Sequence, residues 1–141
     1  MKHEIYFDSG TGRGIGVEVR VTNQRGESII QHSGLKNIII NEYGNFHLGF
    51  EKTNNYGELA GLFIALKLAL KYDVKVIKGD SQVVIDYWSQ GKHHMSDVST
   101  VKLINRVIML RKAFINNGGR IIKIKGKDNI ADIGFHKEKY W

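Results

Sequence analysis

The apolar residues in the first half of the chain change their spacing once, and this change limits the folds open to the chain. Between residues 15 and 21 they occupy every second position, at Ile15, Val17, Val19 and Val21. That period is typical of a half-buried strand. From Leu59 to Leu70 they recur three or four residues apart, which is the period of a buried helix face. The chain therefore places strands first and at least one long helix after them.

The other segments extend this order. Further strands are predicted at 5–8, around 28–32, at 74–77 and at 121–124, and helices at 54–70, 81–89, 97–116 and 128–136. Asn54 or Asn55 can cap the first helix, and Asp97 can cap the third. In the stretch Gly34–Phe50, residues 38–40 and 46–50 suggest a short hairpin, and whether this stretch touches a substrate is open.

The order of elements predicts the fold class. Three consecutive strands favour an antiparallel meander, and strands that follow helices join a sheet in parallel. We therefore expect an α/β fold with a mixed five-stranded sheet, three strands antiparallel and then two parallel, and helices on both faces. The length of 141 residues fits a single domain spanning 1–141.

Composition excludes several classes of protein. There is no cysteine, which rules out disulfides, thiolate zinc sites and cysteine nucleophiles. The apolar stretch Leu59–Leu70 is too short to span a bilayer, and residues 1–20 do not resemble a signal peptide. We expect a soluble, cytoplasmic monomer with no membrane contact. The net charge of +7 favours a nucleic-acid partner, although solubility alone can also explain it.

Four carboxylates fall where active sites form in sheets of this kind, at strand ends and helix starts. They are Asp8, Glu58, Asp80 and Asp132. Any one of them could be an ordinary cap or turn residue. Together they would repel one another unless a cation neutralised them, and Mg²⁺ prefers carboxylate oxygens, water and phosphate. Such a site suits phosphodiester hydrolysis with two metal ions.

Four segments carry a resemblance to a known family. They are Ile5-Tyr6-Phe7-Asp8-Ser9-Gly10, Thr53-Asn54-Asn55-Tyr56-Gly57-Glu58-Leu59, Gly79-Asp80-Ser81-Gln82 and Asp128-Asn129-Ile130-Ala131-Asp132-Ile133-Gly134. In this order they resemble ribonuclease H of type I, and the last segment is most similar to short-loop bacterial catalytic domains. The resemblance implies a ribonuclease H-like fold. It also implies an endonuclease that cuts the RNA strand of RNA–DNA hybrids and leaves 5′-phosphate and 3′-hydroxyl ends.

The resemblance also implies roles for individual residues. Asp8, Glu58, Asp80 and Asp132 would hold two Mg²⁺ ions, for which Mn²⁺ is a possible substitute. The substrate-binding residues would be Ser9, Gly10, Thr53, Asn54, Asn55, Gln82 and Tyr87 or Trp88. Helix capping is an alternative role for the two asparagines, and core packing is one for Tyr87 and Trp88.

The chain departs from the family near its end. Many members carry a mobile histidine before the last helix, whereas the corresponding loop here is Lys125-Gly126-Lys127-Asp128. Asp128 stands one helical turn before Asp132, and the short-loop relatives imply an auxiliary catalytic role for it; a helix N-cap is the alternative. Whether His136 or the pair His93 and His94 takes part is open.

Two other functions remain possible from the sequence. One is another nuclease of the same fold, such as a resolvase, since fold alone does not separate these activities. The other is a relative that binds hybrids without cutting them. The Thr53-Asn54-Asn55 and Asp80-Ser81-Gln82 segments favour the ribonuclease, because the resemblance implies that such residues contact a minor groove that contains 2′-hydroxyls.

Overall fold

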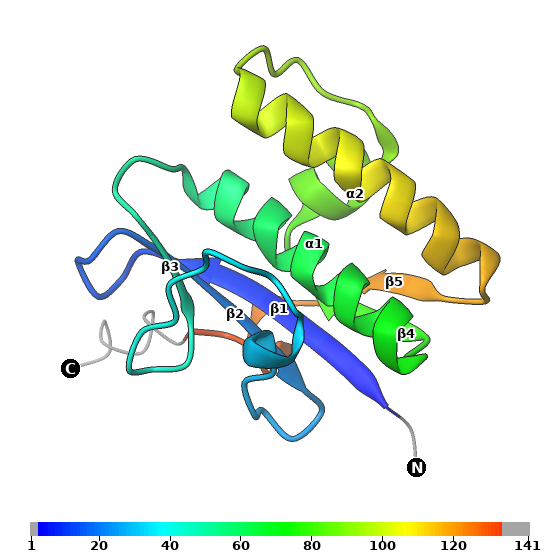
Figure 1. Cartoon of the computed structure of the whole chain (residues 1–141), viewed down its shortest axis with the longest axis horizontal. Coiled ribbons are helices and arrows are strands. Elements are labelled where there is room, and N and C mark those ends of the chain that lie inside the picture. The colour runs from blue at the N-terminus through cyan, green and yellow to red at the C-terminus, as the bar shows by residue number, and fades with distance from the viewer. Residues whose placement is uncertain (1–2, 134–141) are drawn as a thin grey trace.

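The computed structural model of the chain describes residues 3–133, which form a mixed five-stranded sheet with helices (Figure 1). The strands are β1 (Glu4–Gly10), β2 (Val17–Asn23), β3 (Phe46–Gly49), β4 (Val76–Gly79) and β5 (Arg120–Lys123). Their order in the sheet is β3-β2-β1-β4-β5. The pairs β1–β2 and β2–β3 are antiparallel, and β4 is parallel to both β1 and β5. The predicted mixed sheet is confirmed.

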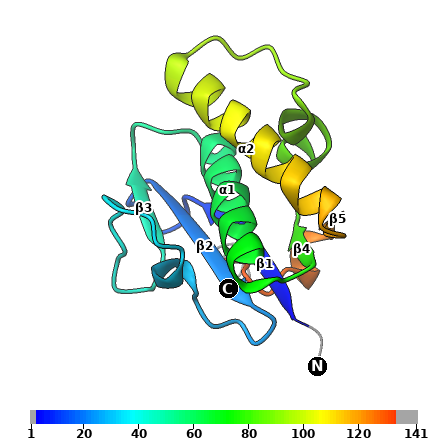
Figure 2. The same ribbon diagram turned by 45° about the vertical axis from the view of Figure 1, so that its right-hand side comes forward.

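Two long helices lie on one face of the sheet, with α1 (Asn54–Tyr72) against β1 and β2 and α2 (Val98–Asn116) packed on α1 (Figure 2). The predicted helix at 81–89 is a π-helical turn, Val83–Tyr87, followed by a 3-10 turn, Trp88–Gln90. Other 3-10 turns are Ile30–His32 and Gly126–Asp128. Within residues 3–133, no helix has the apolar length that a bilayer crossing requires.

Glycine allows α1 to approach the sheet closely at its first turns. A side chain at Gly57 would collide with Ser9 and Val17, and one at Gly61 would crowd Phe7 and Val19. Of the leucines predicted to form the buried face, Leu59, Leu62 and Leu66 are fully buried and Leu70 is half-buried. This contact brings the N-terminal end of α1 against the carboxyl end of β1.

The stretch between β2 and α1 lacks the strand predicted around 28–32 but contains the predicted short hairpin. The strand predicted around 28–32 is wrong: Ser28 makes only an isolated bridge to Thr22, and the chain then turns to bury Ile30. The third strand is β3 instead. The short hairpin is confirmed, since Ile40 pairs with Phe46 and the His47 N–H donates to the Ile39 carbonyl oxygen at 2.8 Å.

Helix ends also differ in detail. The N-cap of α1 is Thr53, whose hydroxyl accepts a hydrogen bond from the Tyr56 N–H, so Asn54 and Asn55 are the first helical residues. Asp97 caps α2 as predicted. No helix begins between Asp128 and residue 133, so Asp128 is not an N-cap within the described chain. The rest of the helix predicted at 128–136, with His136, lies outside the described residues.

Candidate metal and nucleic-acid site

Three of the four predicted acids meet at one edge of the sheet. Asp8 lies near the carboxyl end of β1, Asp80 follows the last residue of β4, and Glu58 lies in the second turn of α1. The parallel strands β1 and β4 end at the same edge, and the glycine contact of α1 brings Glu58 to it. One carboxylate oxygen from each residue lies within 4.8 Å of the others.

Burial makes this cluster electrostatically costly. Asp8 is 7% exposed and Glu58 is 5% exposed. Loss of hydration, reinforced by the charge of Asp80, raises the pKa of Asp8 to about 7. Loss of hydration, followed by the charges of Asp8 and Asp80, raises the pKa of Glu58 to about 10. Acids that resist ionisation in this way are stabilised either when they are protonated or when a cation binds to them.

The hydrogen bonds around the cluster leave oxygen atoms available to a cation. The Ile133 N–H donates to Asp8 Oδ2 at 3.2 Å. Glu58 Oε1 is buried, yet no hydrogen-bond donor among the described residues reaches it. Hard anionic oxygens on rigid elements, one of them without a donor, are the ligand set expected for Mg²⁺ or Mn²⁺.

Asp132 stands beside this group and is not one of the three acids whose oxygens converge within 4.8 Å. Its backbone N–H donates to the Asn129 carbonyl oxygen at 3.0 Å, in a turn that crosses the end of β1. The next residue, Ile133, is the one that bonds to Asp8. Asp132 is therefore placed next to the cluster, and its side chain is half-buried. Asp128 is exposed in the same segment.

Asn129 is a site residue to which the sequence patterns assign no role. Its side-chain amide donates to Asp80 Oδ2 at 3.0 Å and to the Phe7 carbonyl oxygen at 2.9 Å. Its side-chain oxygen accepts from the Ala131 N–H at 3.0 Å. Asn129 is 4% exposed and joins β1, Asp80 and the last described segment. The only signal in the sequence is its place in the Asn129-Ile130-Ala131-Asp132 motif.

The predicted substrate-binding residues fall into two places. Ser9, Gly10, Thr53, Asn54 and Asn55 gather beside the acids, where the Ser9 hydroxyl donates to Asn54 Oδ1 at 2.8 Å. Thr53 is the N-cap of α1, so the two asparagines are not used as caps, and their exposed side chains are open to a ligand.

Gln82, Tyr87 and Trp88 lie on the segment after β4. Gln82 is exposed. Tyr87 is 47% exposed, whereas Trp88 is 8% exposed and belongs to the hydrophobic core. Both aromatic residues line an open hollow of about 540 Å³, together with Val83, Gly91, Lys92, His93 and His94. Tyr87 is therefore the aromatic residue that offers a surface there.

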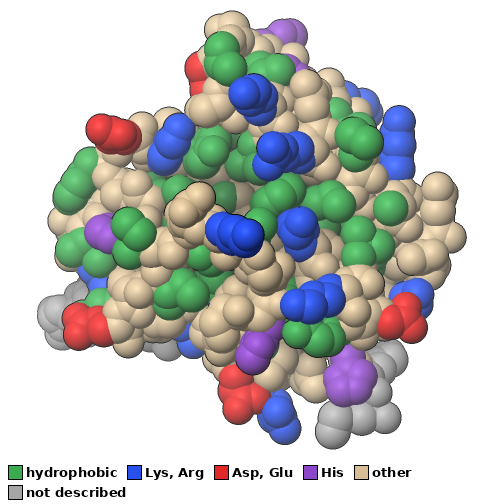
Figure 3. Space-filling view, in the orientation of Figure 1, with side chains coloured by type: hydrophobic (Ala, Val, Ile, Leu, Met, Phe, Trp, Pro, Cys, Tyr) green, Lys and Arg blue, Asp and Glu red, His purple; other side chains and the backbone are tan. Residues whose placement is uncertain are grey.

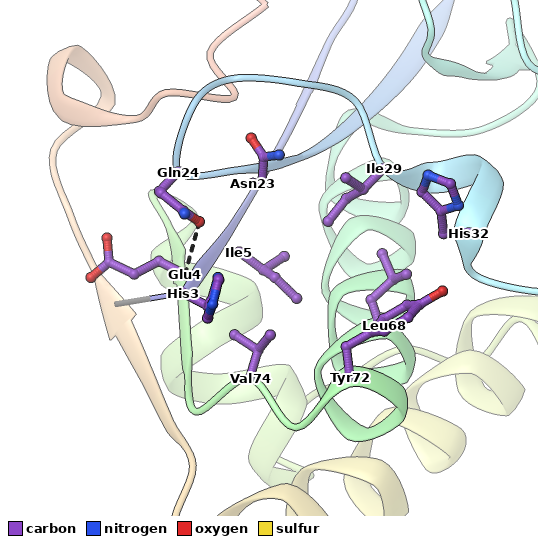
Figure 4. A pocket seen from close by; sticks show the side chains of 10 residues that line it. All are labelled: His3, Glu4, Ile5, Asn23, Gln24, Ile29, His32, Leu68, Tyr72 and Val74. Atoms are coloured by element: carbon purple, nitrogen blue, oxygen red, sulfur yellow. Dashed lines mark hydrogen bonds between the residues drawn. The ribbon is translucent and has the colours of Figure 1, made fainter. Parts of the chain in front are cut away.

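A second hollow lies at the C-terminal end of α1, the end away from Glu58. It has a volume of about 170 Å³, and its lining is mainly apolar, with Ile5, Leu68 and Val74 on its walls (Figure 4). At its rim the Glu4 N–H donates to Gln24 Oε1 at 3.3 Å. The three clustered acids do not line it. This hollow is separate from the candidate metal site.

Basic side chains are distributed over the face that carries the helices. On this face Lys and Arg are scattered among hydrophobic side chains, and Asp and Glu lie mostly near the outline (Figure 3). The helix α2 contributes Lys102, Arg106, Arg111 and Lys112 and contains no acidic residue. The excess positive charge is thus a feature of the folded surface, where it can attract a polyanion.

Comparison with known proteins agrees with this fold. A family model described as reverse transcriptase-like matches residues 23–116. The fold is similar to ribonuclease H1 from the halophilic archaeon Halobacterium salinarum, with 20% identity, a TM-score of 0.54, and 93% of this chain and 91% of that chain covered. LC11-RNase H1, isolated from compost by a metagenomic approach, gives 19% identity, a TM-score of 0.56 and 98% coverage of each chain.

A further structure is that of LC11-RNase H1 in complex with an RNA/DNA hybrid, at 20% identity and a TM-score of 0.55, covering 91% of this chain and 88% of that one. No curated protein sequence matches the chain significantly. The family match covers about two thirds of the chain, and the structural likeness extends over nearly all of it. The chain belongs to the reverse transcriptase-like family and has the fold of type I ribonuclease H proteins.

Proposed function

We propose that this protein is a metal-dependent endoribonuclease that hydrolyses the RNA strand of RNA–DNA hybrids. The observation that carries the proposal is the convergence of Asp8, Glu58 and Asp80 within 4.8 Å at the sheet edge. The hybrid in the complex of LC11-RNase H1 gives the substrate class by analogy. The products would carry 5′-phosphate and 3′-hydroxyl ends.

Two divalent cations are the proposed cofactors, with Mg²⁺ as the natural ion and Mn²⁺ as a substitute. Asp8, Glu58 and Asp80 would hold them, and Asp132 would join from the neighbouring turn. The buried Glu58 Oε1, which accepts no hydrogen bond within residues 3–133, supports this assignment. When bound, such ions activate water for attack and stabilise the charge that develops on the leaving oxygen.

The chain's own residues would orient the site and the substrate. The Ile133 N–H donates to Asp8 and the Asn129 amide donates to Asp80, and these bonds would keep the remaining oxygens of both acids directed at the metal position. Ser9, Gly10 and the exposed asparagines of α1 would contact the hybrid's minor groove beside the scissile phosphate, where the 2′-hydroxyl distinguishes RNA from DNA. Gln82 and Tyr87 would contact sugars of the hybrid, and Asp128 would assist product release.

A cleavage panel tests the proposal. End-labelled RNA–DNA hybrid, double-stranded RNA, double-stranded DNA, single-stranded RNA and a four-way DNA junction would be incubated with Mg²⁺, Mn²⁺ or chelator. We expect cutting of the hybrid's RNA strand alone, and only with metal. Cutting of the junction instead would identify a resolvase. Binding of the hybrid without cutting would identify a non-catalytic relative.

Asn129→Ala is expected to weaken metal binding by about 10- to 100-fold, because partners that orient metal ligands have effects of this size. The variant loses the amide that holds Asp80 Oδ2. Calorimetric titration of the folded protein with Mn²⁺ measures the change. Asn117→Ala, at the exposed end of α2, is the matched control. Unchanged metal affinity in Asn129→Ala, with only a lower melting temperature, would show that Asn129 supports the fold and not the site.

Hybrid binding is expected to weaken steeply as salt rises, because the net charge of +7 makes counterion release a main contribution to affinity. Fluorescence anisotropy with the Asp80→Asn variant, which should leave the hybrid intact, measures this between about 50 and about 200 mM KCl, where we expect at least about a 10-fold loss. An affinity that does not change with salt would contradict an electrostatic mode of binding.

A further inference from the structure

The stretch whose role the sequence leaves open folds against the turn that leads away from the candidate site. We call residues 38–49 the 38–49 hairpin and residues 11–16 the β1–β2 turn. β3 is the edge strand of the sheet and forms the second arm of the hairpin, and the β1–β2 turn lies beside it (Figure 1). The β1–β2 turn follows directly after Ser9 and Gly10, the last two residues of β1.

A buried carboxylate joins the hairpin to β2. Glu18 is fully buried, and in the register of β1 and β2 its direct partner is Gly10. Glu18 Oε1 accepts hydrogen bonds from Asn41 Nδ2 at 2.8 Å and from Asn45 Nδ2 at 3.1 Å. Because Glu18 is not among the clustered acids, the metal site gives no reason for a charge at this position.

The same carboxylate holds the turn through Arg13. Arg13 Nη1 lies 3.5 Å from Glu18 Oε1, and the guanidinium stacks on the Tyr43 ring at 3.6 Å from its centre. Tyr43 is held in turn by its backbone, since its carbonyl oxygen accepts from Arg20 Nη1 at 3.0 Å. The arginine of the turn is therefore clamped between a buried acid and an aromatic ring of the hairpin.

Two further contacts attach the end of the turn to β3. The His47 ring donates through Nε2 to the Ile15 carbonyl oxygen at 2.6 Å. Gly16 packs so tightly on the backbone of Gly49 that any side chain there would overlap it. With the Arg13 clamp, these contacts hold the turn at its middle and at its C-terminal end.

We propose that the 38–49 hairpin positions the β1–β2 turn for the RNA strand, and that Glu18 is the positioning residue that links the two. This inference rests on the proposed function, because it assigns the turn to hybrid binding. Glu18 touches neither metal nor substrate in this scheme. It acts through Arg13, and it keeps Gly10 in the conformation that the hybrid requires.

Glu18→Gln tests the link, because it keeps the size of the side chain and removes its charge. Trypsin cuts after Arg13, and a clamped arginine is cut only when the segment opens locally. We expect faster cutting at Arg13 and a KM for hybrid about 10-fold higher, with kcat and metal affinity close to those of the native protein. Glu42→Gln, an exposed acid on the same hairpin, is the matched control and should change none of these.

A second pair of variants keeps the test valid if Glu18→Gln fails to fold. Tyr43 is 47% exposed, so Tyr43→Ala should fold while losing the stacking surface, and Tyr43→Phe should retain it. We expect the alanine variant to show faster cutting at Arg13 and the higher KM, and the phenylalanine variant to behave as the native protein.

Two results would overturn the inference. One is an unchanged rate of cutting at Arg13 in Glu18→Gln and Tyr43→Ala. The other is an unchanged KM in these two variants, with a fall in kcat that is explained by a smaller fraction of folded protein. The trypsin measurement needs no nuclease activity. The native protein could therefore cut no hybrid while Glu18 still protects Arg13 from trypsin. That result would refute the proposed function and the turn's role in it, and would leave the contacts of Arg13 with Glu18 and Tyr43 established.

Discussion

Asp80→Asn is expected to abolish hybrid cleavage, with a loss of at least about 10³-fold in kcat, while the protein stays folded and still binds hybrid. The amide keeps the shape of the carboxyl group and can still bond to Asn129, but it removes one of the three anionic oxygens that converge at the sheet edge. A cation held by hard anionic ligands is bound far less well by an amide. Single-turnover cleavage of labelled hybrid measures the loss.

The control for this variant lies a few residues along the chain. Asp86→Asn removes the same charge from the turn Val83–Tyr87, outside the clustered acids, and should leave kcat unchanged. Circular dichroism and hybrid anisotropy establish that both variants are folded and bind. Cleavage by Asp80→Asn at the native rate would mean that Asp80 does not hold the catalytic metal.

Glu58→Gln is expected to make the metal-free protein more stable than the native protein at pH 8, although it should be inactive. Burial and neighbouring acids raise the pKa values of Glu58 and Asp8, so ionising them in the folded state costs free energy. At pH 8 the folded protein keeps Glu58 protonated, whereas the unfolded chain releases that proton, and a neutral amide at position 58 removes the resulting cost. We expect a gain in the free energy of unfolding on the order of 1–4 kcal/mol, since one pKa unit corresponds to about 1.4 kcal/mol.

The same raised pKa values make the free energy of unfolding of the metal-free native protein depend on pH. Between about pH 4 and about pH 7 the folded state keeps a proton on Asp8 that the unfolded state releases, so the free energy of unfolding falls as pH rises through this window. Glu58 extends the fall toward higher pH. The stabilisation from these two acids is complete only below their unfolded pKa values.

Thermal unfolding in chelator, from pH 5 to pH 8, measures both effects. The native protein should lose stability across the range from these groups, and Glu58→Gln should lose less. Adding Mg²⁺ at pH 8 should raise the melting temperature of the native protein and have little effect on the variant, because a ligand stabilises only the state that binds it. A Glu58→Gln variant that is less stable than the native protein in chelator at pH 8 would contradict the predicted repulsion.

Much of the fold follows from local patterns in the sequence. The period-two run from Ile15 to Val21 and the helical spacing from Leu59 to Leu70 became β2 and α1. The positions of Asp8 and Asp80 at the ends of apolar strands made them candidates, and the resemblance to ribonuclease H implied a shared site. The structure brings them together because β1 and β4 are parallel neighbours that end at the same sheet edge. These features are local, or follow from general rules of sheet topology.

Other features depend on tertiary contacts that a local pattern does not contain. The segment around Ser28 has the apolar residues of a strand, but Ile30 is buried by a turn, and short apolar runs do not distinguish the two. Thr53 and Asn54 are both good cap residues, and the path of the chain into α1 selects Thr53.

The roles of Asn129 and Glu18 were also beyond the sequence. Asn129 bonds to Phe7, which is 122 residues away in the sequence, and to Asp80, which is 49 residues away. Glu18 stands in an alternating strand as if it were a solvent-facing residue, and it is buried only because the 38–49 hairpin folds over it. Contacts between distant segments determine both residues' environments.

The most direct measurement of the central claim is the chemistry of the cut ends. A hybrid labelled at one RNA end would be incubated with the native protein and Mg²⁺, and the fragments would be analysed by mass spectrometry beside a reaction in chelator. We predict fragments with 5′-phosphate and 3′-hydroxyl ends, formed only with metal, because a water molecule attacks the phosphate. Fragments ending in 2′,3′-cyclic phosphates, or cutting that persists in chelator, would contradict metal-dependent hydrolysis at Asp8, Glu58 and Asp80.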